Sequence, residues 1–380
     1  MSPCHLSPAE RESLKQVEII IWDEAPMASS DMLAVVDRLF RDLMQNEHVP
    51  FGGKVMLLGG DFRQVLPVLQ HGTMAQIIGK CIKRSPLWHH FQQIRLSVNL
   101  RARPEEVAFA EWLMQLGGGT LPLPPNAINQ NCIILPRQCI CDNVVTTLFG
   151  ESFFPNDPIM CERVVLCPTN EHARLRNEEI LNKLHGQKET YKSVDVAGAV
   201  EGENAAALQQ LYPTEFLNIV HLTGLPPHEL NLKKGAVVML IRNLCLARGL
   251  CNGTRLIIMD AKSKVLQVKI ISGAHRGTIH FIPRITLNTK DDINVPFNLC
   301  RRQFPVKLAY AMTINKAQGQ TFDKVGVYLP TPVFTHGQLY VACSRVRSFD
   351  SLFIQVFQNE NQGKVGEDTM TNNIVFKEIL

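Results

Sequence analysis

Two adjacent carboxylates, Asp23 and Glu24, follow an uninterrupted apolar run that ends at Trp22. A strand that delivers such a pair onto a turn broken by Pro26 suits a site for a metal ion and a nucleotide. In that chemistry Asp23 holds a hydrated magnesium ion, and Glu24 polarises a water molecule for attack on a phosphate. Acidic turn residues also follow many strands that carry no such site, so this alternative stays open.

A second polar segment, residues 60–64, follows the next apolar run at 54–58. Because ligands of open parallel sheets bind beyond the carboxyl ends of the strands, we expect both polar segments at one edge. There the amide of Gln64 is placed to hydrogen-bond a terminal phosphate and to respond to its hydrolysis. The alternative interpretation is a plain polar turn in which Asp61 caps a helix.

Two more segments late in the chain carry residue types that bind phosphates. Residues 313–321 are rich in hydroxyl, amide and small side chains, and such groups at the start of a helix hold phosphates of a nucleotide or of a DNA strand. Arg345 follows among apolar residues, and a guanidinium that reaches across a cleft stabilises the charge of phosphoryl transfer. Each feature is common alone, so their order along one chain is the informative pattern.

A phosphate-binding loop of the form G-x-x-x-x-G-K-[ST] is absent from the 380 residues. Its three Gly-Lys pairs are followed by Val55, Cys81 and Val365, none of which supplies the required hydroxyl. Only 22 residues precede Asp23. We therefore expect an incomplete nucleotide site, and apolar surface left exposed around the first strand.

The composition is that of a globular protein with two or three domains, with 45% hydrophobic and 19% charged residues. A net charge of +4 means that binding to nucleic acid requires a local basic groove. The eleven cysteines lack the spacing of a disulfide framework, and the densest group leaves a zinc site as an alternative to free thiols. Without a run of the ~18–20 apolar residues that span a membrane, or a signal-peptide layout, we expect an intracellular protein.

The elements that position these residues alternate between strand and helix patterns, which predicts an α/β layer sandwich. A helix capped by Ser29 or Ser30 is expected to bury Met32, Val36, Leu39, Leu43 and Met44. Buried strands are expected at 17–22, 54–58, 163–167, 306–310, 325–329 and 352–356. Helices are expected at 104–116, 170–185, from 313 and near 336–341. Short β segments at 237–241, 254–259, 265–271 and 278–282, separated by Asn-Gly and Ser-Gly turns, predict an inserted small barrel.

In this order the segments resemble the petite-integration-frequency (Pif) helicase family, most closely the helicase regions encoded by Helitron-type transposons. Residues 23–27 resemble helicase motif II, and the later motifs III, IV, V and VI are matched by residues 59–67, 96–101, 311–321 and 340–347. Further family landmarks lie at 167–170, 212–218, 224–228 and 242–256. The resemblance covers residues 15–357, and Ala317 stands where the family usually carries Ser.

The resemblance implies an α/β fold with two RecA-like P-loop NTPase domains, the first incomplete, and a small SH3-like β domain inserted in the second. The C-terminal part of the first domain would span 1–95. The second would comprise 96–210 and 301–357, with the insert at 211–300 and a C-terminal tail at 358–380.

The resemblance also implies ATP-dependent 5′-to-3′ unwinding of DNA in repair, recombination, telomere maintenance or transposition, with ATP and Mg²⁺ as cofactors. Asp23 would hold Mg²⁺, Glu24 would activate water, and Gln64 would sense the γ-phosphate. Arg101 and Arg345 would be arginine fingers, and Gly319 would line the nucleotide site. The residues that would touch single-stranded DNA are Thr169, Asn170, Thr313, Lys316 and Gln318.

The expected partners are single-stranded DNA and duplex junctions, with no membrane, for a monomer located in the nucleus. One hypothesis is a helicase that is catalytic in its complete form, of which this chain is an N-terminally truncated part. An alternative is a shortened transposon remnant that binds DNA without hydrolysing ATP. A third, an interaction module that binds neither, gives no reason for Glu24, Gln64, Arg101 and Arg345 to occur together.

Overall fold

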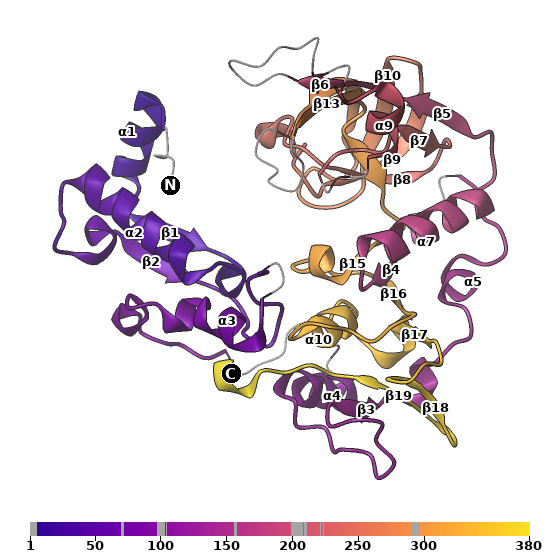
Figure 1. Ribbon diagram of the computed structural model, residues 1–380, viewed down its shortest axis with the longest axis horizontal. Helices are drawn as coiled ribbons and strands as arrows, with labels where there is room; N and C mark the ends of the chain where they lie inside the picture. The colour runs from indigo at the N-terminus through magenta and orange to yellow at the C-terminus, as the bar shows by residue number, and fades with distance from the viewer. Residues whose placement is uncertain are drawn as a thin grey trace.

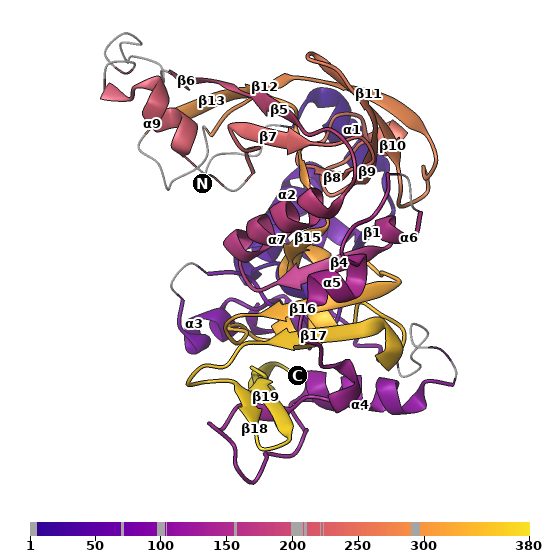
Figure 2. The ribbon, with the colours of Figure 1, turned by 90° about the vertical axis from the view of Figure 1, so that its right-hand side faces the viewer.

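The computed structural model describes residues 6–69, 72–96, 103, 105–155, 158–198, 208, 211–220, 222, 224–289 and 297–380. In Figure 1 an N-terminal unit lies on the left and a second α/β unit at the lower right, and a β-rich region lies above the second unit in Figures 1 and 2. The helices are α1 (Pro8–Gln16), α2 (Ser30–Met44), α3 (Met74–Gly79), α4 (Val107–Gly118), α5 (Val144–Phe149), α6 (Pro158–Cys161), α7 (Asn170–Lys183), α9 (Thr214–Ile219) and α10 (Gln338–Cys343).

The strands form a small parallel sheet, a larger parallel sheet and several antiparallel ones. Their bounds up to β9 are β1 (Ile19–Trp22), β2 (Val55–Leu58), β3 (Cys132–Ile134), β4 (Arg163–Cys167), β5 (Glu189–Lys192), β6 (Val194–Gly198), β7 (Glu229–Leu232), β8 (Val237–Leu240) and β9 (Arg255–Ala261). The later strands are β10 (Val265–Ile270), β11 (Ile279–Pro283), β12 (Ile285–Leu287), β13 (Asn298–Gln303), β14 (Val306–Leu308), β15 (Ala311–Thr313), β16 (Lys324–Leu329), β17 (Leu352–Val356), β18 (Gly363–Val365) and β19 (Asp368–Asn372).

In the N-terminal unit β1 and β2 pair in parallel, as the two apolar runs predict. The expectation that both strands are buried is wrong for one of their faces. Alternate residues pack toward α2, whereas Ile19, Ile21, Val55 and Leu57 are 57%, 72%, 58% and 53% exposed. A parallel sheet is buried only where elements cover both of its faces, and in the described residues one face is covered. The predicted exposure of apolar surface around the first strand is therefore confirmed.

Helix α2 begins after Ser29, whose hydroxyl accepts a hydrogen bond from the backbone N–H of Met32, as the predicted cap requires. The predicted face is correct in part, because Leu43 is buried and Val36 and Leu39 pack against the core. Met32, however, is 55% exposed, and Leu33, Asp37 and Phe40 are buried as well. Asp37 is buried because its carboxylate accepts from the backbone N–H of Phe51 at 2.6 Å and from Arg41 at 2.8 Å. The bond from Phe51 holds the turn before β2 against α2.

The second unit is built on a parallel sheet in the order β15-β4-β16-β17, in which β4, β16 and β17 lie where strands were predicted. The strand expected at 306–310 is instead β14, which pairs in an antiparallel manner with β8, and β15 takes its place in the parallel sheet. Helices α5 and α7 pack against β4, and α10 packs against β16 and α4. Two predicted elements differ in detail. Helix α4 begins at Val107 and continues through Gly118, and the helix expected from Thr313 is instead a 3₁₀ turn at Ile314–Ala317.

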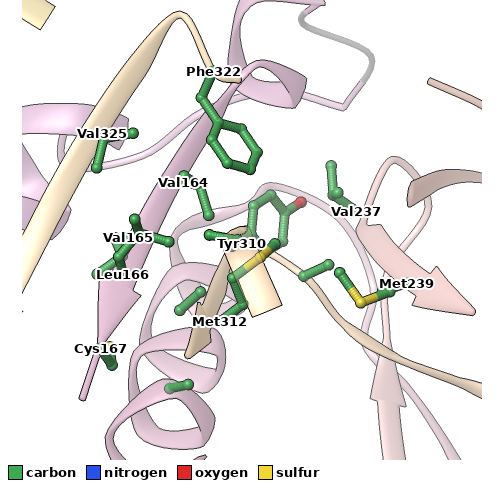
Figure 3. Close-up of a cluster of buried hydrophobic side chains, with 14 of the residues drawn as sticks. Val164, Val165, Leu166, Cys167, Val237, Met239, Tyr310, Met312, Phe322 and Val325 are labelled. Carbon is green, nitrogen blue, oxygen red and sulfur yellow. The ribbon is translucent and has the colours of Figure 1, made fainter. Parts of the chain in front are cut away.

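The β-rich region contains the four short strands predicted between 237 and 282, joined in an antiparallel sheet of order β11-β10-β9-β8-β14. It extends beyond the expected 211–300, since β5, β6 and β14 also pair within it. Tyr310 marks its junction with the parallel sheet, because its ring lies between β4 residues and Val237 and Met239 of β8 (Figure 3). This buried contact fixes the β-rich region on the second unit.

Residues 358–380, expected to be a tail, contain the hairpin β18–β19, which pairs with β3. Residues 373–380, here called the strap, then run to the N-terminal unit (Figure 1). Phe376 and Ile379 of the strap form a small core with Leu66 and Cys81. The Nζ of Lys83 donates to the carbonyl oxygens of Ile379 at 2.8 Å and Leu380 at 3.0 Å. The strap therefore joins the two α/β units.

All ten cysteines among the described residues are free thiols, as predicted. Within the same residues no group of three His, Cys, Asp or Glu side chains is arranged to hold a metal ion, so the zinc alternative finds no support. None of the helices in the described part of the chain has the length and apolar character needed to cross a membrane.

Candidate functional site

The Asp-Glu pair lies at the carboxyl end of β1, where the backbone is tied to the end of β2. The N–H of Ala25 donates to the carbonyl of Gly59 at 2.9 Å, and the N–H of Gly59 donates to that of Trp22 at 2.9 Å. Oδ1 of Asp23 accepts from the N–H of Glu24 at 2.9 Å, and Asp23 is exposed. Glu24 has a left-handed backbone with φ 52°. Such a conformation costs a non-glycine residue on the order of 1–3 kcal/mol and is concentrated at functional sites.

The segment that carries Gln64 is a closed turn held by Asp61. Oδ1 of Asp61 accepts from the backbone N–H of Arg63 at 3.0 Å and from its Nε at 2.8 Å. Oδ2 accepts from the hydroxyl of Tyr340 at 2.9 Å, and burial raises the pKa of Tyr340 to about 12. Asp61 thus closes a turn, in place of the helix cap considered as an alternative. Oε1 of Gln64 is buried without a hydrogen-bond partner among the described residues.

Glu24 of the N-terminal unit contacts the segment 313–321 of the second unit. The sequence alone did not predict this contact. Nε2 of Gln318 donates to Oε2 of Glu24 at 3.0 Å, although the two residues lie 294 positions apart. Gly319 follows with φ +75°, and a Cβ on it would lie 3.8 Å from Oε1 of Glu24. Three predicted site residues, Glu24, Gln318 and Gly319, are therefore neighbours.

The start of α10 brings the Gln64 turn against the second unit. Gly337 has φ +69°, and a Cβ on it would lie 2.2 Å from the carbonyl oxygen of Arg63 and 2.8 Å from that of Gln64. The residue before it, His336, is fully buried. Its Nε2 lies 2.7 Å from the carbonyl of Phe62, and its Nδ1 accepts from the backbone N–H of Phe376 at 2.8 Å.

The two predicted arginine fingers have different outcomes. Arg345 is 1% exposed, and its guanidinium donates to the carbonyls of Val341 and Gln320 at 2.9 and 3.2 Å and to Oγ of Ser344 at 2.7 Å. These three bonds lie within its own unit, and a role of Arg345 toward phosphate stays a prediction. Arg101 lies outside the described residues.

The predicted DNA-contacting residues gather at the carboxyl ends of two neighbouring strands. β15 pairs in parallel with β4, with Thr313 opposite Cys167. Thr169 follows β4 and caps α7, its hydroxyl accepting from the N–H of His172 at 3.3 Å, while Asn170 is exposed. Lys316 lies in the turn after β15, and loss of hydration lowers its pKa. The structure thus brings Thr169, Asn170, Thr313 and Lys316 to one sheet edge, with Gln318 turned toward Glu24.

Sequence reasoning missed two residues of this region, His336 and Lys307. His336 was expected only as part of a helix, and nothing in its local pattern indicates contacts with residues 62 and 376. Lys307 lies on β14, half-buried, and removal of water together with repulsion from Lys316 and Arg301 lowers its pKa to about 8. A lysine inside an otherwise apolar strand is the one signal that could have found it.

Two family models match the chain. Residues 2–126 match the one described as PIF1-like helicase, and residues 215–260 match DNA helicase Pif1, 2B domain. A human protein named ATP-dependent DNA helicase PIF1 is 28% identical over 92% of this chain and 48% of its own length. ATP-dependent DNA helicase Pif1 of Campylobacter jejuni is 26% identical over 93% of this chain and 72% of its own. The chain spans about half the length of the vertebrate relatives that it matches.

Solved structures agree with these matches in fold. Bacteroides Pif1 bound to ssDNA has a TM-score of 0.68 at 22% identity, covering 95% of this chain and 75% of that one. The Bacteroides complex with ADP-AlF3 and ssDNA has a TM-score of 0.66, also at 22% identity. The fold is therefore that of paired RecA-like α/β domains. The chain is therefore similar to PIF1-like helicases in both matched segments and in fold, as the resemblance of its motifs predicts.

Proposed function

We propose that this chain serves ATP-dependent, 5′-to-3′ unwinding of DNA, with single-stranded DNA and duplex junctions as partners. The observation that carries the proposal is the 3.0 Å hydrogen bond between Glu24 and Gln318. It joins the predicted water-activating carboxylate to the turn that carries Thr313 and Lys316. Contact between a nucleotide site and a DNA track is what coupling of hydrolysis to movement requires.

The residues of the site could bind the magnesium ion and the terminal phosphate of a nucleotide. Asp23 offers an exposed carboxylate of the kind that holds hydrated Mg²⁺, and the buried, unpartnered Oε1 of Gln64 leaves that amide free to reorient toward a phosphate. Glu24 would accept a proton from the attacking water. Bound Mg²⁺ would neutralise charge on the phosphates. Arg101 and Arg345 remain the proposed fingers, and Gly319 the proposed backbone contact.

The first test is ATP hydrolysis by the purified chain with and without single-stranded DNA. Glu24→Gln is expected to lower DNA-stimulated turnover by about 10²-fold or more, because it removes the general base. Glu12→Gln, an exposed carboxylate on α1, is the matched control and should leave turnover unchanged. Turnover that survives Glu24→Gln would contradict the proposed role of Glu24.

A second candidate function is binding of DNA without hydrolysis, and the observation that favours it is the gathering of Thr169, Asn170, Thr313 and Lys316 at one sheet edge. It predicts salt-sensitive binding to single-stranded DNA and no turnover in the same assay. We also propose a monomer located in the nucleus, where such a substrate is found. Repair, recombination, telomere maintenance and transposition are the proposed settings of this activity.

A further inference from the structure

The hydrogen bond between Gln318 and Glu24 occupies one of the two oxygens with which a carboxylate can accept from water. Nε2 of Gln318 donates to Oε2 of Glu24 at 3.0 Å, and a Cβ added to Gly319 would lie 3.8 Å from Oε1. A carboxylate is an acceptor, so an amide donor on one of its oxygens competes with a water molecule for the same lone pairs. The bond therefore holds Glu24 in a state that is less available to accept a proton from water.

The amide of Gln318 forms a hydrogen bond through its nitrogen but, within the described part of the chain, not through its oxygen. Its Oε1 is buried without a hydrogen-bond partner among the described residues. A buried amide in a stable arrangement normally has partners for both ends, so an unpartnered oxygen indicates a side chain with a second arrangement. The left-handed backbone of Glu24, with φ 52°, likewise marks a residue held under strain.

Gln318 is also joined directly to the predicted DNA track. It follows the 3₁₀ turn Ile314–Ala317, which begins after Thr313 and contains Lys316. The backbone N–H of Gln318 reaches the carbonyl of Asn315 only at 3.4 Å, a long bond for a turn. A phosphodiester bound at Thr313 and Lys316 would pull on the same short turn, so it would bias the position of the Gln318 side chain.

We propose that Gln318 is a positioning residue that restrains Glu24 when DNA is absent, and that single-stranded DNA on the 313–316 turn releases it. This inference rests on the proposed function, because it assigns a regulatory contact to that site. By linkage, a contact that DNA must break weakens DNA binding by the same factor by which DNA frees Glu24. The restraint is therefore measurable by DNA affinity alone, without hydrolysis.

The test is a double-mutant cycle on the affinity of the whole chain for a fluorescent oligothymidylate, followed by anisotropy at fixed salt. Glu24→Ala is expected to tighten binding by about fivefold or more in the natural background, since it removes the acceptor that holds Gln318. In a Gln318→Ala background the same change should tighten binding only by the effect of removing a negative charge. The difference between the two backgrounds isolates the contact.

Two further variants keep the cycle interpretable. Asp23→Asn removes the neighbouring exposed carboxylate, whose Oδ1 accepts from the backbone N–H of Glu24, and should act equally in both backgrounds. If Glu24→Ala fails to fold, Glu24→Met serves in its place, because it keeps a long side chain without a carboxylate acceptor for Gln318 and should shift affinity in the same direction. Equal tightening by Glu24→Ala in both backgrounds would overturn the restraint and leave the proposed function standing. Failure of the unsubstituted chain to bind the oligonucleotide would overturn both.

Discussion

Lys307, on β14 of the β-rich region, is a charged side chain that has no opposite charge beside it among the described residues. No carboxylate lies within ion-pair distance of its Nζ in the described residues, and Lys316 and Arg301 are its charged neighbours. Burial and this repulsion lower the pKa of Lys307 to about 8 from its usual value near 10.5. Between these values the unfolded chain binds more protons than the folded one, so the free energy of unfolding rises with pH in that window.

From this residue we predict proton uptake when single-stranded DNA binds at pH 8. A phosphate near Lys316 would favour the charged form of Lys307 and raise its pKa, so binding would take up to about half a proton there. Calorimetry in two buffers of different ionisation enthalpy measures this uptake. Lys307→Met should abolish it and reduce the salt dependence of binding by about one charge. Equal binding enthalpies in both buffers would contradict the prediction.

At the scale of elements, β6 and β13 of the β-rich region are joined by a buried ion pair. Arg301 and Asp195 are 1% and 3% exposed, and Nη2 of Arg301 donates to Oδ2 of Asp195 at 2.7 Å. The same guanidinium donates to the carbonyls of Leu217 and Pro226 at 2.9 Å each. These carbonyls belong to two family landmarks, 212–218 and 224–228, whose role here is to close the β-rich region around Arg301.

We predict that Asp195→Asn lowers the free energy of unfolding by about 3–5 kcal/mol, because it leaves the Arg301 charge buried and unpaired. Glu367→Gln is the matched control, since its pair with Arg137 is exposed and worth about 0–1 kcal/mol. Denaturation by urea, followed by circular dichroism, measures both. Similar losses from the two substitutions would show that the buried pair contributes no more than a surface pair.

A second contact between elements is that of Gly337, before α10, with the Gln64 turn. Gly337→Ala should cost more than Gly366→Ala by about 2 kcal/mol or more, because overpacking adds to the left-handed strain. Gly366 is the control: its φ of +64° is close to the +69° of Gly337, but nothing lies within 4 Å of the position of its Cβ. Urea denaturation compares the two variants. Equal losses would mean that the turn moves aside without cost.

At the scale of the whole molecule, the strap and His336 hold the two α/β units together. Because the N–H of Phe376 donates to Nδ1 of His336, the ring proton lies on Nε2 and is donated to the carbonyl of Phe62. A protonated ring would turn Nδ1 into a donor that faces another donor. Burial lowers the pKa of His336 below its usual value, while Asp61 opposes this shift.

This arrangement predicts a loss of stability in mild acid. Below about pH 6.5 the unfolded chain protonates its histidine while the folded chain does not, so stability falls as pH drops toward the lowered pKa. His336→Phe should cost about 2–4 kcal/mol at pH 7.5, because it leaves two buried backbone groups unpaired. It should also flatten the difference in urea midpoint between pH 5.5 and 7.5. An unchanged pH dependence in this variant would show that other groups cause it.

The residues adjacent to strands could be predicted from local pattern. Asp23, Glu24 and Gln64 follow apolar runs, and Thr169 and Thr313 follow two strands of one parallel sheet, so their gathering at sheet edges follows from topology. The face of α2 was harder, since Asp37 is buried only through its hydrogen bond with Phe51. The burial of a polar residue can be predicted only when its hydrogen-bond partner is known.

Neighbouring residues and spacing were enough to predict the similarity to Pif helicases, three strands of the second parallel sheet, and the carboxylates and amides of the candidate site. The bond between Gln318 and Glu24, the burial of Arg345 and the strap at 373–380 became visible in the three-dimensional structure alone. Each of these depends on contacts between segments far apart in the chain. Such contacts are set by how the two units pack, which no local pattern encodes.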